Sequence, residues 1–365
     1  MARTSPTALG RDHIRALNQR AVIDAIHQHA RISRSELAAE LRLSPAAVTA
    51  ITATFIREGL IYEAEQGNSN TVGRKPILLG INYDYAFVYG IKVSNAAITT
   101  ALANLNSEVL ACRSDPLHAH DLHSVLDAIE TSTARLLRDS RIPEDKIIGL
   151  GVNLPGIVEP GNGIVRHSPL LGWSGVPFAT TLQERLRVPV LVENDVNALA
   201  AAEAWFGYGR QHDSFLVLTL GRGIGLGIVI DGKVYRGPHG GAGEFGHATL
   251  RPLNAPHQAS GTLESFLSDA ALLDHAHQKI PGFPEDATPE DLTELAAQGN
   301  PDALALLREA GELLGLALSY LIDIFAPALI ILSGEGVRNA PYLLPHTRSA
   351  LAEHSFGDLA QQTRL

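Results

Sequence analysis

The sequence predicts two kinds of structure in one chain: a small, mainly helical unit within the first eighty residues and a larger α/β portion from Ile81 onward. Short capped helical segments fill the chain up to Gly59, whereas the later chain alternates apolar strand-like runs with amphipathic helices. Charge changes as well, since residues 1–80 hold 10 Lys and Arg against 7 Asp and Glu, and the remainder holds 19 against 32. The basic amino-terminal part is a candidate for binding a polyanion, and the acidic body is not.

Three helices are expected in the amino-terminal part. Apolar side chains recur at helical spacing over Asp12–His29. Ser33 precedes the second helix and has Glu36 three residues later, a capping box in which each side chain accepts a free backbone N–H at the start of the helix. The third helix follows Ser44, has proline at its first position, where the missing N–H costs nothing, and ends at Gly59.

The tight turn between the second and third helices predicts a helix-turn-helix, whose later helix can enter a DNA major groove. The segments LIYEA and ILLGI then supply a β-hairpin, the wing. On local pattern alone, a helical hairpin that binds protein is the alternative. The third helix is expected to bury Val48, Ile51 and Phe55, to expose Ala50 on its outer side, and to contact DNA through Ser44, Ala46, Ala47 and Thr49.

The wing ends in the segment GRKP, where Arg74 and Lys75 stand between a glycine and a proline. A narrow, extended and cationic strip of this kind can lie in an A·T-rich minor groove. The alternative is a solvated loop. We therefore assign residues 1–65 to a winged helix-turn-helix and residues 66–80 to the wing and a linker with DNA contacts at Arg74 and Lys75.

Composition excludes several classes of protein. No apolar run approaches the roughly 20 residues that span a bilayer, and the amino terminus lacks the apolar stretch of a signal peptide. We expect a cytoplasmic location and no membrane partner. Cys112 is the only cysteine, which excludes a disulfide within the chain and a cysteine-built zinc site. Cys112 itself is expected to be a small buried apolar residue.

The body of the chain predicts two related α/β lobes. The segments AFVYGIKV, AITTALANL and EVLACRSDPL are typical of three consecutive strands, and a helix and the strand KIIGLGVNL follow. A second series begins near Val188 with VPVLVEND, a helix, the strand SFLVLTL and the strand LGIVIDG, and closes with a long helix and the strand ALIILSG. Ligands in such sheets bind at the carboxyl ends of the strands.

The glycine-rich segment GRGIGLG connects two of these strands. A dinucleotide fingerprint needs a helix directly behind its glycines, so this context excludes one. A backbone loop that meets a phosphate and a plain tight turn both stay possible.

Polar residues interrupt an apolar run in LVENDVNALAAAE. Glu193, Asn194 and Asp195 stand at the end of an expected strand, where buried polar groups need partners. The question is what they bind.

The order of several motifs resembles the ROK family of repressors and sugar kinases. These motifs are ISRSELA, LSPAAVTAI, GRKP, NLPGIV, ENDVNALAAAE, GGAGEFGH and SGTLE, and more narrowly they resemble the xylose-repressor and N-acetylglucosamine-repressor type. The resemblance covers about residues 12–340. It implies an actin-like, hexokinase-like domain over residues 81–365 with a sugar between two lobes, lobe I at about 81–187 plus the C-terminal helix and lobe II at about 188–340.

The resemblance also implies sugar contacts. The Asn-Asp pair of ROK kinases hydrogen-bonds sugar hydroxyls, and its aspartate is the general base. The implied sugar-binding residues are Asn194, Asp195, Glu244, His247 and Glu264. Carboxylates, amides and imidazoles suit a polyol because each hydroxyl both donates and accepts. For Glu193 we expect an ordinary structural role.

Departures from the family pattern argue against an enzyme. ROK kinases carry an Asp-x-Gly-Gly-Thr phosphate loop where this chain has KVSNA, Lys92 to Ala96, and their second loop, Gly-Thr-Gly, has become Gly221-Arg222-Gly223. Without a held γ-phosphate Asp195 has no acceptor for a deprotonated hydroxyl, so we expect no catalytic residue and no ATP.

The family's zinc ligands are one histidine and three cysteines. The cysteine positions correspond to Ala255, His257 and Thr262, and His247 with His257 alone does not make a tetrahedral site. We therefore expect no metal and no cofactor.

Two hypotheses follow. The first is a sugar-responsive transcriptional regulator, most simply a repressor of carbohydrate uptake or catabolism genes such as those of xylose metabolism, acting as a homodimer or a dimer of dimers. Its partners would be operator DNA and a sugar or sugar phosphate. The second is a ROK sugar kinase with a DNA-binding appendage. The sequence leaves the sugar open among xylose, glucose, N-acetylglucosamine and their phosphates.

Overall fold

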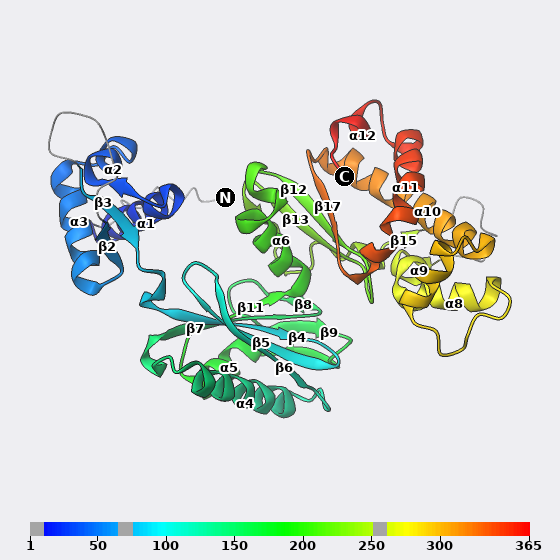
Figure 1. Cartoon of the computed structure of the whole chain (residues 1–365), viewed down its shortest axis with the longest axis horizontal. Helices are drawn as coiled ribbons and strands as arrows, with labels where there is room; N and C mark the ends of the chain where they lie inside the picture. Colours follow the sequence, from blue (N-terminus) through cyan, green and yellow to red (C-terminus); the bar gives the residue numbers. More distant parts are fainter. Residues whose placement is uncertain (1–10, 65–75, 251–260) are drawn as a thin grey trace, which may run out of the picture. The chain divides into compact units, whose positions relative to one another are not determined.

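The computed structural model describes residues 11–64, 76–250 and 261–365 (Figure 1). The chain divides into two compact units, the first formed by residues 1–90, 99–114 and 130–150 and the second by residues 91–98, 115–129 and 151–365. The expected contacts Arg74 and Lys75 and the zinc-pattern positions Ala255 and His257 lie outside the described residues.

A winged helix-turn-helix opens the first unit, as predicted. Helices α1, α2 and α3 are accompanied by a small antiparallel sheet of order β1-β3-β2. The hairpin β2–β3 has the register Ile61 opposite Ile81. The elements are α1 Arg11–His29, β1 Ile32–Ser33, α2 Arg34–Glu40, α3 Pro45–Glu58, β2 Ile61–Ala64 and β3 Leu78–Ile81.

Capping residues mark the starts of α2 and α3 and the end of α3, as the sequence predicts. The Ser33 Oγ accepts the Glu36 N–H at 3.3 Å, and the Glu36 Oε2 accepts the Ser33 N–H at 2.8 Å. These hydrogen bonds to Ser33 hold the pKa of the Glu36 carboxyl below its usual range. Ser44 caps α3, and Gly59 ends it in the left-handed region at φ 83°.

Buried apolar side chains hold the three helices against the small sheet. Val48, Ile51 and Phe55 of α3 face this core, as expected. Along α1 the core side is limited to the carboxyl half, because Val22 and Ile26 are fully buried whereas Ile14 is 46% exposed.

A five-stranded sheet of order β11-β7-β4-β5-β6 follows in the chain. The three consecutive strands and the following helix are confirmed, and Cys112 on β6 is exposed rather than buried, since β6 alternates and this position faces solvent. The elements are η1 Tyr83–Tyr85, β4 Phe87–Val93, β5 Ala97–Asn104, β6 Val109–Pro116, α4 Leu122–Ser140, η2 Glu144–Lys146, β7 Ile147–Leu154 and β11 Val190–Asn194.

A smaller sheet of order β10-β9-β8 lies in the second unit and contributes one strand to the site described below. Its elements are β8 Ile157–Val158, β9 Val165–Ser168 and β10 Trp173–Val176, followed by helix α5 Phe178–Leu186. Trp173 on β10 is buried at 5% exposure, and its indole N–H donates to the His120 carbonyl at 2.7 Å.

The structure moves one expected lobe boundary. Strand β11 was expected to begin the second lobe near Val188, but it is the edge strand of the five-stranded sheet. Its carboxyl end leads directly into α6, Asp195–Phe206, whose core lies on the next sheet. The polar residues Glu193 and Asn194 therefore stand at the junction between two sheets.

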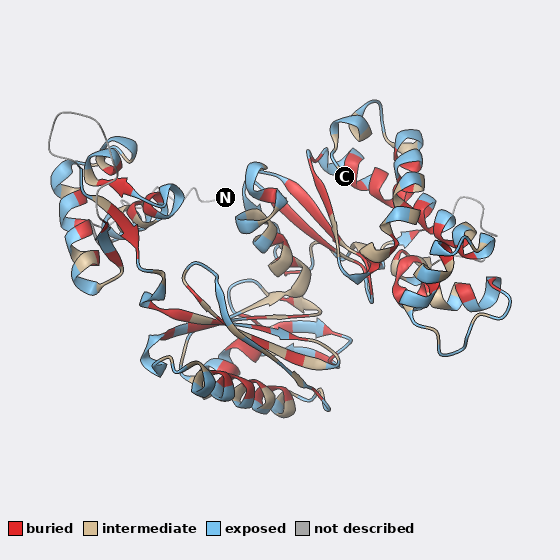
Figure 2. Ribbon diagram, viewed as in Figure 1, coloured by how far each residue is buried: buried red, intermediate tan, exposed pale blue. Residues whose placement is uncertain are grey.

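The second large sheet has the order β14-β13-β12-β17 and apolar cores on both faces. Along β12, Leu216 and Leu218 face a leucine-rich cluster with α10, whereas Phe215 and Val217 face α6, as period-two alternation requires. Figure 2 shows the buried strands of this sheet. The elements are β12 Phe215–Thr219, β13 Gly225–Ile230, β14 Lys233–Val234, β17 Ile330–Ser333 and α10 Pro301–Phe325.

Helix α6 lies close to strand β13. A Cβ atom at Gly227 would stand 2.7 Å from the Ala200 Cβ, so only glycine permits this approach. The seating of α6 fixes its first residue, Asp195.

The remaining elements surround the leucine-rich cluster. The C-terminal helix, expected with the first lobe, belongs here instead, because Leu359, Ala360 and Leu365 pack against this core. The elements are η3 Tyr208–Gln211, η4 Phe245–His247, β15 Thr249–Leu250, β16 Gly261–Thr262, α7 Glu264–Leu267, α8 Asp269–Lys279, α9 Pro289–Ala297, η5 Glu335–Asn339, α11 Ala340–His354 and α12 Leu359–Gln362.

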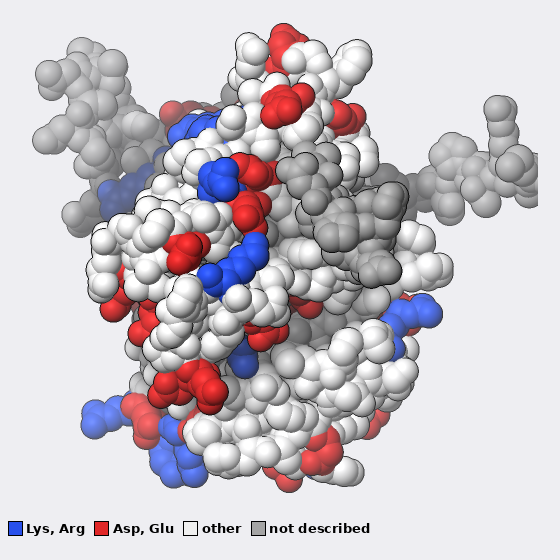
Figure 3. Space-filling model, turned by 90° about the vertical axis from the view of Figure 1, so that its right-hand side faces the viewer, with Lys and Arg blue, Asp and Glu red and all other residues white. Residues whose placement is uncertain are grey.

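The surface seen in Figure 3 intersperses acidic and basic side chains. The Lys279 ammonium pairs with Glu309, and Arg308 lies 3.9 Å from Glu312. Such a surface creates no extended positive field for a polyanion. Among the described residues, no helix has the length and apolar character needed to cross a membrane.

Replacing Ser33 by alanine is expected to destabilise α2 by about 1 kcal/mol, because it removes the side chain that satisfies a free N–H at the helix start. Native-state hydrogen exchange of the α2 amides in the full chain measures the effect. Ser35→Ala is the control, since its Oγ contacts only the Ser33 Oγ, at 3.0 Å, among the hydrogen bonds found for it. Equal protection of α2 in wild type and Ser33→Ala would contradict the prediction.

Candidate functional site

Asn194 ends β11 and caps α6. Its Oδ1 accepts the N–H groups of Val196 at 2.9 Å and Asn197 at 3.0 Å, and its Nδ2 donates to the Gly156 carbonyl at 3.0 Å. An amide has two N–H donors, so one stays available for a hydroxyl. Asn194 thus has a structural role first, and its assignment as a sugar contact stays a prediction that rests on this remaining N–H.

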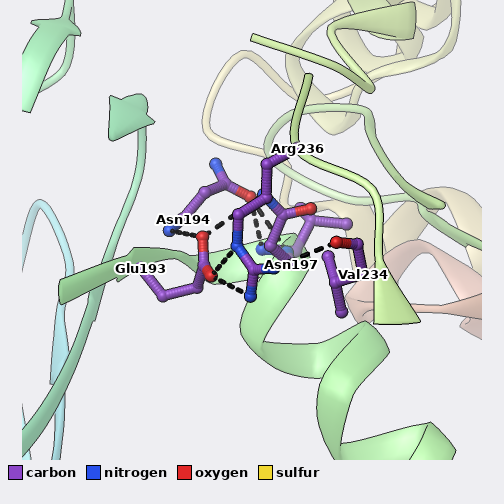
Figure 4. Close-up of polar contacts among 6 residues, drawn as sticks. Glu193, Asn194, Asn197, Val234 and Arg236 are labelled. Carbon is purple, nitrogen blue, oxygen red and sulfur yellow. Dashed lines mark hydrogen bonds and ion pairs between the residues drawn. The ribbon is translucent and has the colours of Figure 1, made fainter. Parts of the chain in front are cut away.

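Glu193 has an entirely structural set of partners, as expected. Its Oε2 accepts from the Arg236 Nε at 2.6 Å, and its Oε1 accepts from the Asn194 N–H at 3.0 Å and the Asn197 Nδ2 at 3.3 Å (Figure 4). These contacts answer what the polar group at the end of the apolar strand binds: it binds other parts of the protein.

Asp195 is the first residue of α6, and most of its carboxyl is removed from solvent. Burial raises the pKa of this carboxyl above the ordinary value of 3.8, while the Val196 N–H and the charge of Lys92 act in the opposite direction. A carboxylate at a helix start is a strong hydrogen-bond acceptor, and removing it from water destabilises its ionised form. Such destabilised groups are characteristic of binding sites.

Glu244 and His247 stand at the ends of η4 in the segment GEFGH. Their closest charged atoms, Glu244 Oε2 and His247 Nε2, are 3.8 Å apart. Gly243 precedes them at φ 94°, and a Cβ there would lie 1.9 Å from the Leu226 carbonyl oxygen. The segment can therefore lie against β13 only with glycine at this position, which explains why the motif carries it.

Glu264 begins α7 and reaches the glycine-rich loop between β12 and β13. Its Oε2 accepts the Ile224 N–H at 2.9 Å. A Cβ at Gly223 would stand 2.9 Å from the same oxygen. Glu264 therefore holds this loop in place, in addition to any contact with a sugar.

Electrostatics bring the predicted residues together around Glu244. Partial burial raises the pKa of the Glu244 carboxyl; the charge of His247 lowers it, and the charges of Asp195 and Glu264 raise it further. The side chain of Glu244 keeps 39% of its surface exposed, so the cluster is open to a ligand. Three of the other four expected sugar contacts thus lie within electrostatic range of Glu244, and the remaining one, Asn194, adjoins Asp195.

His167 and Lys92 belong to this cluster and were missed by sequence reasoning. The charge of His167, on β9, lowers the pKa of Glu244. A Cβ at Gly156 would lie 2.4 Å from the His167 carbonyl oxygen, so the glycine whose carbonyl accepts from Asn194 also seats this strand. His167 stands in the segment RHSPLLGWSG, where no motif or spacing singles it out.

The cluster can recognise a polyol. Three carboxylates supply acceptors, one amide N–H and two imidazoles supply donors, and sugar hydroxyls pair with both kinds of group. The same set is poorly suited to bind an anionic ligand group close to Asp195 and Glu244, because like charges repel in a partly desolvated site.

Helix α3 and its cap carry the residues that were expected to contact DNA. Ser44, Ala46 and Thr49 are exposed and Ala47 is partly buried. Ser44 Oγ accepts the Ala47 N–H at 3.2 Å, and the Thr49 hydroxyl donates to the Pro45 carbonyl at 2.8 Å. The assignment of these residues to DNA stays a prediction.

Comparison with known proteins decides the family. The ROK family model matches residues 88–364, which is more than half of the chain, and a model described as winged helix-turn-helix DNA-binding matches residues 15–62. The chain belongs to the ROK family.

Relatives within the ROK family share nearly the whole length of this chain. A protein named xylose repressor from Caldicellulosiruptor bescii is 29% identical over 94% of this chain and 89% of its own length. The protein named DNA-binding transcriptional dual regulator NagC of Escherichia coli is 29% identical over 93% of this chain and 86% of its own length.

Solved ROK structures include regulators and kinases. A ROK family transcriptional regulator, described as a homolog of the Escherichia coli MLC protein, matches with a TM-score of 0.86 and 29% identity over 97% of this chain and 92% of that structure. A ROK family glucokinase from Streptomyces griseus, in complex with glucose and AMPPNP, matches with a TM-score of 0.63 and 27% identity over 74% of this chain and 90% of that structure. The likeness to the regulator includes the amino-terminal part of the chain.

The segment KVSNA, expected to stand at the position of the first ROK phosphate loop, includes a tight hairpin turn between β4 and β5. The Ser94 hydroxyl donates to the Ala97 carbonyl at 2.9 Å, and the Ala97 N–H returns a bond to the Ser94 Oγ at 3.1 Å. The Asn95 carbonyl is bonded to the His120 Nε2 at 2.7 Å. A turn closed on itself in this way offers no glycine backbone for a phosphate to approach.

Cys112 is the only cysteine of this chain, so the zinc pattern that the family resemblance implies is expected to be lost. Of its four ligand positions only His247 and Thr262 are described, and threonine supplies no thiolate. Within residues 11–64, 76–250 and 261–365, no group of three or more His, Cys, Asp or Glu side chains could hold a metal ion. The expectation of a protein without metal or cofactor stays a prediction.

Replacing Asp195 by asparagine is expected to raise the melting temperature at pH 7 by a few degrees. The folded-state pKa of Asp195 lies above its unfolded value, so the folded protein retains a proton that the unfolded chain has lost, and stability falls as the pH rises through that window. Asparagine removes this penalty. The difference should shrink as the pH approaches 3.8, the ordinary aspartate pKa.

Thermal unfolding of both proteins between acidic and neutral pH measures the difference. Asp286→Asn, an exposed aspartate of the second unit, controls for the loss of one negative charge. A variant less stable than wild type at pH 7 would mean that hydrogen bonds of the carboxylate outweigh its desolvation.

Proposed function

We propose that the protein is a sugar-responsive transcriptional repressor that binds operator DNA through its winged helix and a sugar in its ROK domain. The observation that carries the proposal is the match of one chain to a winged helix-turn-helix over 15–62 and to the ROK family over 88–364. The relatives named xylose repressor and NagC share this full length and support the same role.

The cluster around Glu244 is the proposed effector site. Asn194, Asp195, Glu244, His247 and Glu264 are its expected contacts, and a neutral sugar such as xylose or glucose suits three carboxylates better than a sugar phosphate does. The sugar would act by binding more tightly to one of two conformations of the protein, since only differential affinity shifts an equilibrium.

The proposed repressor acts in the cytoplasm as a homodimer or a dimer of dimers. A helix-turn-helix commonly reads two half-sites about one helical turn apart, and two-fold symmetric operators require two copies of the recognition helix. Genes for carbohydrate uptake or catabolism are the targets that a sugar effector suggests.

We further propose that the protein is not an enzyme. Positioning and charge neutralisation supply nearly all of the catalysis in phosphoryl transfer, so a base at Asp195 contributes little without a phosphate loop. The self-closed turn at Ser94 and the Arg222 substitution in the second loop support the loss of ATP. A carboxylate of Glu335 also stands 2.8 Å from the position of a Cβ at Gly221, which disfavours an anion there.

A paired measurement tests this function: operator gel shift and ADP release with the same panel of D-xylose, D-glucose, N-acetylglucosamine and their phosphates. We expect one sugar to change operator binding without ATP and no sugar-dependent ADP release. Asp195→Asn should bind the operator like wild type and lose most of the sugar response, because the amide places an NH2 donor where the carboxylate has its second accepting oxygen, and it lacks the negative charge that strengthens hydrogen bonds from hydroxyls.

Sugar-dependent ADP release at about 1 to 100 per second, the ordinary range of kinases, would establish the alternative of a ROK kinase with a DNA-binding appendage. Operator binding that ignores every sugar in the panel would remove the effector part of the proposal. An unchanged sugar response in Asp195→Asn would remove Asp195 from the site.

A second prediction concerns Arg74 and Lys75, which lie outside the described residues. Replacing both by alanine should weaken operator binding and reduce the slope of log affinity against log salt by up to about two, because each cation at the phosphates releases about one counterion. Binding isotherms at several salt concentrations measure the slope. Unchanged affinity at low and moderate salt would make the segment a linker only.

A further inference from the structure

We propose that the ion pair between Glu193 and Arg236 is a positioning clamp of the effector site. Neither residue is expected to touch the sugar. The pair joins the β11–α6 junction, which carries Asn194 and Asp195, to the segment that leads into Glu244 and His247. The proposal rests on the proposed effector site and adds the residues that set its spacing.

The two oxygens of Glu193 have separate partners. Oε2 accepts from the Arg236 Nε at 2.6 Å and lies 2.5 Å from the Arg236 Nη2. Oε1 accepts from the Asn194 N–H at 3.0 Å and from the Asn197 Nδ2 at 3.3 Å. One carboxylate therefore binds the β11–α6 junction and Arg236 at once, as Figure 4 shows.

Arg236 is anchored in its own segment as well. Its Nη1 donates to the Val234 carbonyl at 3.0 Å, which orients the guanidinium at the end of β14. The backbone carbonyl of Arg236 accepts the Ala242 N–H at 3.1 Å, and the Gly243 carbonyl accepts the Leu226 N–H at 3.1 Å. The segment of residues 235–247 is thus held at its start by Arg236 and near its end by β13.

This connection transmits position to the sugar contacts. Arg236 precedes Glu244 by eight residues in the chain. The hydrogen bond from the Ala242 N–H to the Arg236 carbonyl connects the two ends of this segment directly. On the other side, the Asn194 N–H bonded to Glu193 belongs to the residue that caps α6 and directly precedes Asp195. A shift of the clamp would change the separation of Asp195 and Glu244.

The clamp is strong because it is partly shielded from water. The side chains of Arg236 and Glu193 keep only 34% and 24% of their surface exposed. Charge-assisted hydrogen bonds in such surroundings are shorter and stronger than exposed ones, and removing one partner leaves the other charge without compensation. An exposed ion pair would not hold a segment in register.

Another ion pair of the second unit provides a control. The Arg185 Nη1 on α5 lies 2.5 Å from the Asp127 Oδ1 on α4, with 28% of the arginine and 67% of the aspartate side chain exposed. Asp127 and Arg185 lie on helices that carry none of the expected sugar contacts. Asp127→Asn therefore removes a carboxylate from an arginine without touching the effector site.

The test variants separate the clamp from the junction. Glu193→Gln keeps an oxygen for the Asn194 N–H and the Asn197 amide but presents an NH2 group to Arg236. Arg236→Lys keeps the charge and loses the guanidinium fork, so it gives a milder break if Glu193→Gln folds poorly. A double variant of Glu193→Gln with Arg236→Lys completes a double-mutant cycle.

Two readouts on the full chain decide the proposal. Hydrogen exchange without sugar should become faster in residues 237–247 of Glu193→Gln, while exchange in α10 stays unchanged. Affinity for the sugar of the panel that acts on wild type should fall by about tenfold, because small displacements of contacts carry large penalties. The double variant should lose no more affinity than Glu193→Gln alone, and Asp127→Asn should resemble wild type in both measurements.

Unchanged exchange in residues 237–247 would overturn the proposal, as would unchanged sugar affinity despite faster exchange. Additive losses in the double variant would also overturn it, because the two residues would then act independently. If wild type binds no sugar of the panel, the proposed effector function fails, and exchange alone decides the clamp: faster exchange confined to residues 237–247 supports it, and unchanged exchange contradicts it.

Discussion

Helix α6 approaches its sheet closely enough for Ala200 to occupy the space that any side chain at position 227 would need. This approach has a direct effect on Asp195, the first residue of the helix, because the N-terminus of α6 cannot shift without opening an apolar core. The cap by Asn194 and the contacts of Glu193 and Glu264 are arranged around that fixed point. The other groups of the candidate site are therefore placed around a carboxylate whose helix is closely packed on its sheet.

The candidate site holds partly buried carboxylates whose ionised forms are destabilised, a cost that a purely structural cluster would avoid. Burial raises the pKa of both Asp195 and Glu244, so each carboxylate is less stable in its ionised form than it would be in water. Glu193 is different, since every oxygen has a partner within the protein. Asp195 and Glu244 therefore have hydrogen-bond acceptors available to a ligand. Glu193, whose oxygens all have partners, is a group that supports them.

Sequence reasoning succeeded where the determining interactions are local. The capping box at Ser33 and the left-handed end at Gly59 depend on neighbours within four residues, so their positions could be predicted to the residue. The expected sugar contacts came from the resemblance carried by the order of family motifs. Arg236 and His167 could not be found in this way, because the partner of Arg236 is 43 positions away and His167 approaches Glu244 from another sheet. The edge position of β11 likewise depends on pairing with β7, a contact that apolar pattern alone does not specify.

Cys112 was expected to be buried and is exposed on β6. Because the chain contains no other cysteine, a thiol-specific fluorophore or spin label attaches at a single known position without any engineered substitution. The same sheet contains β11, whose end carries Glu193 and Asn194. A label on the natural chain therefore reports on the sheet that carries part of the candidate site. A second cysteine introduced elsewhere would allow the distance between two labels to be measured.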